Sequence, residues 1–147
     1  MTRPQKVLDE LTGTMQIDPD QYSPVTSPNR LKSLGYALAG WLYMLRHQKN
    51  TRLMTVASII VMVVALWLQI ESLGWALLVV VITLVWMAEF LNAAVEAVVN
   101  LSSPDYHPMA KVSKDVAAAA VLLAVVAAML VGLLVLGPPL LSRLGLV

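Results

Sequence analysis

The sequence contains no cysteine and little charge: charged residues make up 13% of its 147 positions, and the formal net charge is +1. The absence of cysteine excludes disulfide frameworks, thiolate zinc sites and cysteine nucleophiles. The small net charge excludes a protein that gathers nucleic acid through a broad basic field, so no nucleic-acid partner is expected. The glycine-rich phosphate-binding motifs of soluble nucleotide-binding folds are also missing.

Apolar residues dominate what is present. They make up 59% of the chain, and the mean hydropathy is +0.75. A soluble fold of this length could not remove so much apolar surface from water, whereas a bilayer accepts it. The composition therefore predicts an all-α membrane protein.

Three regions follow from the distribution of polar residues. Residues 1–28 are rich in proline, aspartate and other turn formers, which predicts a flexible polar N-terminal arm. We expect residues 29–140 to form an integral-membrane domain. Residues 141–147 would form a short C-terminal tail.

The domain is predicted to begin with a surface helix over residues 30–49. Leucines recur there at steps of three and four, and basic residues flank them. This pattern is typical of an amphipathic helix that lies in the membrane interface. The alternative is a soluble helix packed on a core, but no soluble core is evident nearby. The repeating leucines are Leu31, Leu34, Leu38, Leu42 and Leu45.

Three membrane spans are predicted at about 53–70, 75–99 and 116–136. The first has no charged residue over 18 positions, which corresponds to about 27 Å of helix, close to the thickness of the hydrocarbon core. We expect the third span to end before Gly137, Pro138 and Pro139, because proline interrupts helical hydrogen bonding.

Lysine and arginine predict the orientation. Seven of the ten lie at or before Arg52, and Lys111 and Lys114 lie between the second and third spans. The positive-inside rule then predicts a multi-pass protein with a cytoplasmic N-terminus. Acidic residues inside the second span would face lipid in a single copy, so an oligomer is expected.

The second span carries a polar stripe. Glu89, Asn92, Glu96 and Asn100 are separated by steps of three, four and four, which place them on one helical face. Placing an acidic residue within a membrane is energetically unfavourable, because its carboxylate needs a proton, a metal or a cation. Such residues are therefore usually functional. The alternative is polar bonding between helices, which is more plausible for Asn92 than for two glutamates.

A second polar motif precedes the third span. Lys114 and Asp115 are predicted at the entrance of that helix, where a lysine can meet a phosphate. The alternative is an ordinary helix cap with a basic membrane anchor. His107, in the preceding link, is expected to be a loop residue rather than a ligand, because it lies far from His47.

Residues 89–115 resemble the signature of the small prokaryotic diacylglycerol kinase family, which includes undecaprenol kinases. The shared features are a glutamate, an asparagine three residues on, a glutamate four further, and a lysine–aspartate pair before an alanine-rich helix. The likeness covers residue 29 to about residue 136.

The resemblance implies a homotrimer of three-span subunits with a surface helix and active sites at subunit boundaries, in a bacterial inner (plasma) membrane. It implies an enzyme that transfers the γ-phosphoryl group of MgATP to a membrane lipid, nominally diacylglycerol, with undecaprenol a close rival. Carried over, Glu89 would be the general base and Glu96 would hold Mg²⁺. Asn92, Lys114 and Asp115 would contact the nucleotide.

The chain departs from the family at two positions. Gln48 stands where the family usually has a second metal-binding glutamate, and a neutral amide is the weaker Mg²⁺ ligand. Asn100 stands where aspartate is frequent. Gln48 favours the alternative of a weakened or non-catalytic family member. A small ion-conducting protein, with Glu89 and Glu96 along an ion path, is a further alternative.

Overall fold

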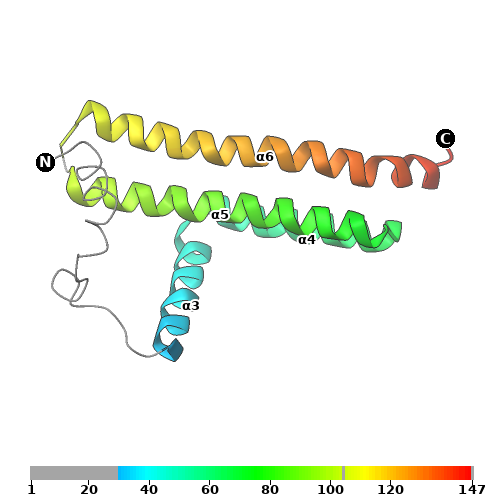
Figure 1. Ribbon diagram of the computed structural model, residues 1–147, viewed down its shortest axis with the longest axis horizontal. Coiled ribbons are helices and arrows are strands. Elements are labelled where there is room, and N and C mark those ends of the chain that lie inside the picture. Colours follow the sequence, from blue (N-terminus) through cyan, green and yellow to red (C-terminus); the bar gives the residue numbers. More distant parts are fainter. Residues whose placement is uncertain (1–29, 104, 147) are drawn as a thin grey trace, which may run out of the picture. The chain divides into compact units, whose positions relative to one another are not determined.

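The computed structural model describes residues 30–103 and 105–146, and within them every regular element is an α-helix. The helices are α3 (Arg30–His47), α4 (Lys49–Leu68), α5 (Ser72–Ser102) and α6 (Pro108–Arg143) (Figure 1). The prediction of an all-α protein is confirmed. The predicted arm, residues 1–28, lies outside the described residues. Helices α4, α5 and α6 belong to one compact unit, residues 42–147.

Three of these helices are long and apolar enough to cross a membrane. Helix α4 has 20 residues, α5 has 31 and α6 has 36. At a rise of 1.5 Å per residue, α5 and α6 are about 46 and 54 Å long, so their ends extend beyond a hydrocarbon core of about 30 Å. The three predicted spans correspond to α4, α5 and α6; α5 and α6 extend beyond the predicted bounds at both ends, and α4 begins earlier and ends at Leu68.

The predicted end of the third span is wrong. Helix α6 continues through Pro138 and Pro139 to Arg143. The two prolines lack the N–H groups that would bond the carbonyls of Leu134 and Val135, but their fixed φ is compatible with a helix. Membrane helices tolerate such prolines, because stopping there would leave still more backbone groups unbonded.

The start of α6 also differs from the prediction. The helix begins at Pro108, so Lys114 and Asp115 lie in its second turn and not at its entrance. The imidazole Nδ1 of His107 accepts a hydrogen bond from the Met109 N–H at 3.2 Å, and proline suits the first helical position. His107 thus caps the helix, in agreement with its expected place in the link.

Gln48 separates the predicted surface helix from the first span. Its backbone is extended (φ −97°, ψ 118°), so α3 ends at His47 and α4 begins at Lys49. The Gln48 N–H still donates to the Met44 carbonyl at 2.9 Å. The location of α3 in the membrane interface stays a prediction.

A tight turn joins α4 to α5. Gln69 adopts the left-handed conformation (φ 54°, ψ 47°), and the Ile70 N–H donates to the Ala65 carbonyl at 3.4 Å. This arrangement closes the helix in the manner of a Schellman motif. Helix α5 then reverses direction against α4. Near the same end, the Arg143 guanidinium lies 4.9 Å from the centre of the Trp67 ring, which ties α6 to α4.

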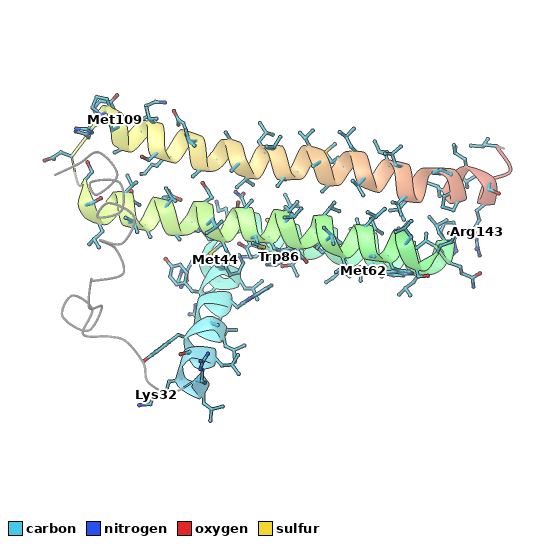
Figure 2. All side chains as sticks on the ribbon, in the orientation of Figure 1. Lys32, Met44, Met62, Trp86, Met109 and Arg143 are labelled. Atoms are coloured by element: carbon cyan, nitrogen blue, oxygen red, sulfur yellow. The ribbon has the colours of Figure 1, made fainter. Side chains whose placement is uncertain are left out.

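Helices α5 and α6 run antiparallel and side by side (Figure 1). Few side chains of the unit are buried, and within α6 none is (Figure 2). The exposed side chains are mostly leucine, valine and isoleucine. Such a surface suits contact with lipid rather than with water.

Gly74 marks a close approach between α5 and α6. A Cβ atom built at Gly74 would lie 3.0 Å from Cγ1 of Val135 and 3.3 Å from Cδ1 of Ile70, whereas one built at Gly132 would meet nothing within 4 Å. Gly74→Val is therefore expected to lower the free energy of unfolding by about 1–3 kcal/mol through overpacking. Gly132→Val is the matched control and should change it less. Thermal unfolding in detergent measures both, and equal effects would contradict the close approach.

Candidate functional site

The polar stripe lies on α5 as predicted, and its burial changes along the helix. The Glu89 side chain is only 3% exposed, Asn92 is half-buried, and Glu96 and Asn100 are exposed. Glu89 and Asn100 are eleven residues apart, or about 16 Å along the helix axis. The stripe thus leads from the interior of the helical unit to the end where α5 turns into α6, which we name the loop end.

A polar cavity of about 340 Å³ lies at the loop end. It is formed by the last turn of α5, the link and the first two turns of α6. The cavity brings together Asn100, Lys114 and Asp115, which the sequence places fourteen and fifteen residues apart. Its other lining residues are Val99, Ser103, Asp105, Tyr106, His107, Ala110 and Lys111.

Two side-chain interactions organise this polar cavity. The Lys114 ammonium donates to the Asn100 side-chain oxygen at 2.6 Å and so joins α6 to α5. Lys111 forms an ion pair with Asp115 one turn along α6. Both partners of the ion pair are more than 60% exposed, so it contributes little to stability. It does, however, neutralise Asp115 and leave Lys114 with an uncharged partner.

Other predicted site residues stand outside the polar cavity. Glu96 lies one helical turn before Asn100 on the same face of α5. Asn92 and Glu89 lie one and two further turns from the cavity. Gln48, at the N-terminus of α4, is half-buried. Among the described residues, no three histidine or acidic side chains form a group able to hold a metal ion.

Helix α4 carries polar side chains that the sequence reading missed. The Trp86 Nε1–H on α5 donates to Ser58 Oγ at 3.2 Å. Thr51 lies seven residues before Ser58, hence on the same face, and is fully buried. Its hydroxyl has no hydrogen-bond partner in the described structure, whereas Thr55 donates to the Thr51 carbonyl at 2.8 Å. The available signal was the spacing of Gln48, Thr51, Thr55 and Ser58 at steps of three, four and three.

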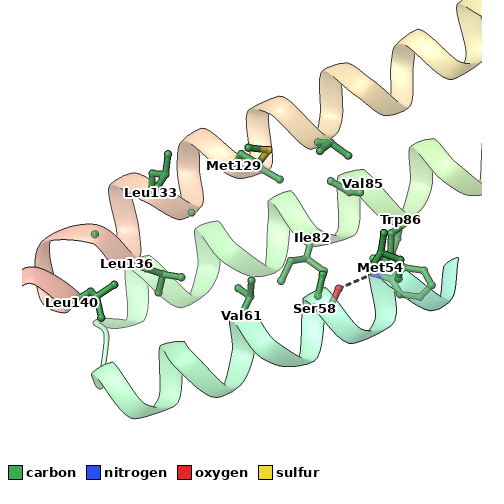
Figure 3. A pocket seen from close by; sticks show the side chains of 16 residues that line it. Met54, Ser58, Val61, Ile82, Val85, Trp86, Met129, Leu133, Leu136 and Leu140 are labelled. Atoms are coloured by element: carbon green, nitrogen blue, oxygen red, sulfur yellow. Dashed lines mark hydrogen bonds between the residues drawn. The ribbon is translucent and has the colours of Figure 1, made fainter. Parts of the chain in front are cut away.

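An apolar groove of about 590 Å³ runs between α4, α5 and α6 (Figure 3). Its hydrogen-bonding side chains, Ser58 and Trp86, bond to each other, so the rest of the lining is hydrocarbon, methionine sulfur and glycine. Trp86 precedes Glu89 by one helical turn. The groove thus comes within a turn of the buried carboxylate. Representative lining residues are Met54, Val61, Ile82, Val85, Met129 and Leu133.

Known proteins resemble the chain along most of its length. The family model for prokaryotic diacylglycerol kinase matches residues 35–136. A diacylglycerol kinase of Synechocystis sp. is 44% identical over 117 residues, which cover 79% of this chain and 67% of the relative. A diacylglycerol kinase of Escherichia coli (strain K12) is 33% identical over 100 residues, 68% of this chain and 82% of the relative. An undecaprenol kinase of Bacillus subtilis is 30% identical over 109 residues, 74% of this chain and 89% of the relative.

The unpartnered, buried hydroxyl of Thr51 gives a test of the polar face of α4. Thr51→Val replaces the hydroxyl with a methyl group of similar size, so it should leave the free energy of unfolding unchanged or raise it by about 1–2 kcal/mol. Thr55→Val removes a bonded hydroxyl and should lower that free energy by about 1 kcal/mol. Thermal unfolding in one detergent compares the two variants. A clear loss of stability in Thr51→Val would show that its hydroxyl is bonded after all.

Proposed function

This chain belongs to the prokaryotic diacylglycerol kinase family, and we propose that it transfers the γ-phosphoryl group of MgATP to the hydroxyl of a membrane lipid at the α5 site. That the protein is a membrane-embedded lipid kinase follows from its family, its relatives and its three apolar helices. These relatives do not favour a non-catalytic or ion-conducting protein.

The observation that carries the proposed reaction is the position of Glu89. This carboxylate is nearly buried, one turn from the end of the apolar groove, and shares a helical face with residues that lead to the polar cavity. A lipid alcohol can approach from the groove while a nucleotide enters from the loop end. The proposal therefore assigns Glu89 as the base that accepts the hydroxyl proton.

The transfer itself requires positioning more than covalent chemistry. The lipid oxygen forms a bond to the γ-phosphorus, the bond to the β-phosphate oxygen breaks, and ADP leaves. Lys114 would offset the charge of the phosphate oxygens, and Asn92 and Asp115 would orient the nucleotide. Aligning the reacting oxygen and phosphorus is the main contribution of these side chains.

The donor set suits one Mg²⁺ ion bound together with ATP. Mg²⁺ is commonly held by one or two carboxylates and the substrate phosphates, and it retains several waters. Glu96 supplies an exposed carboxylate one turn from the polar cavity. When bound, the ion neutralises charge on the β- and γ-phosphates.

Gln48 is the proposed second, weaker ligand of this ion. The Trp86–Ser58 hydrogen bond fixes the register of the antiparallel helices α4 and α5. Gln48 lies ten residues from Ser58 along α4, and Glu96 lies ten residues from Trp86 along α5, both toward the loop end. Each is therefore about 15 Å along its helix axis from the Trp86–Ser58 bond, so the two side chains lie at a similar level in the membrane.

Diacylglycerol is the first candidate for the lipid, because two of the relatives described above carry that name. Undecaprenol is the second, because the Bacillus subtilis relative is an undecaprenol kinase. Both lipids end in a primary hydroxyl on a long apolar body, which fits a groove with an apolar lining.

We place the protein in a bacterial inner membrane with its N-terminus and loop end in the cytoplasm. Lys49 and Arg52 at the start of α4, and Lys111 and Lys114 at the start of α6, support this orientation. We also propose an oligomer, because Glu96 is exposed in a single chain and a neighbouring subunit would cover it. The family resemblance makes a homotrimer the expected form.

A phosphotransfer assay tests this function. The protein in lipid nanodiscs should transfer ³²P from γ-labelled ATP to diacylglycerol or undecaprenol, offered side by side, and only with Mg²⁺. Glu89→Gln should lower kcat by about 10²-fold or more while ATP still binds, because the base is lost. If neither lipid is labelled by the wild-type protein, the proposed function is wrong.

The metal assignment has a separate test. Gln48→Glu should lower the Mg²⁺ concentration for half-maximal activity, because a carboxylate binds Mg²⁺ better than an amide does. Gln69→Glu makes the same chemical change at the opposite end of α4 and should not alter it. Binding of Mn²⁺ in the presence of ATP, followed by electron paramagnetic resonance, checks the assignment without turnover. An unchanged Mn²⁺ affinity in Gln48→Glu would remove this residue from the metal site.

A further inference from the structure

Asn100 makes a contact between α5 and α6 to which the proposed reaction assigns no role. Its side-chain oxygen accepts a hydrogen bond from the Lys114 ammonium at 2.6 Å, and both residues line the polar cavity. A bond from an ionised donor is stronger than one between neutral groups. It joins side chains fourteen residues apart, so it depends on the packing of the two helices.

A lysine at this position needs a partner to hold it in place. Its charge lies at the end of a flexible four-carbon stem with many rotamers. Asn100, by contrast, lies two residues before the end of α5, on a continuous helix. Its oxygen therefore fixes the ammonium against the wall of the polar cavity before any ligand enters.

The charges around the polar cavity show why a neutral partner matters. Its lining contains two lysines and two aspartates, and the Lys111–Asp115 ion pair accounts for one of each. An amide orients Lys114 without cancelling its positive charge. The charge remains available for an anion such as a phosphate group.

We propose that Asn100 is a positioning residue of the nucleotide site, whose oxygen holds the Lys114 ammonium where it meets a phosphate of ATP. This inference rests on the proposed function, because it takes the polar cavity as the place where the nucleotide binds. It adds a residue that acts through Lys114 and has no contact with the lipid.

A purely structural role makes a different prediction. If the Asn100–Lys114 bond served only to join α5 to α6, its loss would lower the unfolding temperature, and nucleotide affinity would fall only as folded protein is lost. A positioning role instead raises the KM for ATP in a folded protein and leaves the lipid KM unchanged.

The test compares Asn100→Leu with Asn100→Asp in nanodiscs. Leucine removes the acceptor oxygen, so the Kd and the KM for MgATP should rise about tenfold, as expected for a charge-assisted hydrogen bond, while kcat changes little. Aspartate keeps an acceptor oxygen but adds a negative charge that offsets that of Lys114, so it should recover only part of the affinity. Ser102→Ala is the control: its hydroxyl bonds the Val98 carbonyl of its own helix, and its loss should leave ATP binding unchanged.

Equilibrium dialysis with ³²P-labelled ATP and Mg²⁺ gives the Kd, and thermal unfolding reports the fold. Wild-type affinity in a folded Asn100→Leu protein would overturn this inference and leave the proposed function intact. A loss of affinity in both variants in proportion to lost stability would also overturn it. A wild-type protein that binds no ATP would instead refute the proposed function itself.

Discussion

A carboxylate held inside the membrane-spanning helices is the constraint on which the rest of this structure depends. Glu89 is 3% exposed in a unit whose other buried side chains are mostly apolar. A charge in such surroundings is unfavourable unless protons, cations or hydrogen bonds compensate it. The structure buries this carboxylate, and Asn92, Glu96 and Asn100 follow it at successive turns of α5 toward the polar cavity. A helix of 31 residues makes that connection possible, because it extends beyond the hydrocarbon core.

The same helix joins regions suited to two different solvents. On one side of Glu89, the apolar groove offers a lining fit for a hydrocarbon chain. Beyond Glu96, the polar cavity offers an ammonium, an amide and carboxylates. A reaction between a lipid alcohol and a water-soluble nucleotide needs both kinds of surface within reach of one base. Helix α5 offers both surfaces in turn along its length, within the described part of the chain.

Local sequence patterns were enough to predict the three long apolar helices and the polar face of α5, because each follows from hydropathy or helical spacing. Helix ends were predicted less well. Pro138 does not end α6. Ending a helix inside a membrane would leave more backbone groups without hydrogen bonds than a proline does. The spacing of Thr51 and Ser58 was not recognised, because neither side chain carries the charge that distinguishes Glu89 and Glu96 within a span. The bond between Asn100 and Lys114 requires knowledge of how two helices pack, which no local pattern contains.

The central claim, that MgATP binds at the loop end of α5, is tested most directly by a distance-dependent spectroscopic measurement. The natural chain has no cysteine, so a nitroxide can be attached at one introduced position, Ser102→Cys or Ser72→Cys, at opposite ends of the same helix. Mn²⁺ added with ATP should broaden the nitroxide spectrum strongly at Ser102 and leave the one at Ser72, about 45 Å away along the axis, unchanged. Equal broadening at both ends, or stronger broadening at Ser72, would contradict the account.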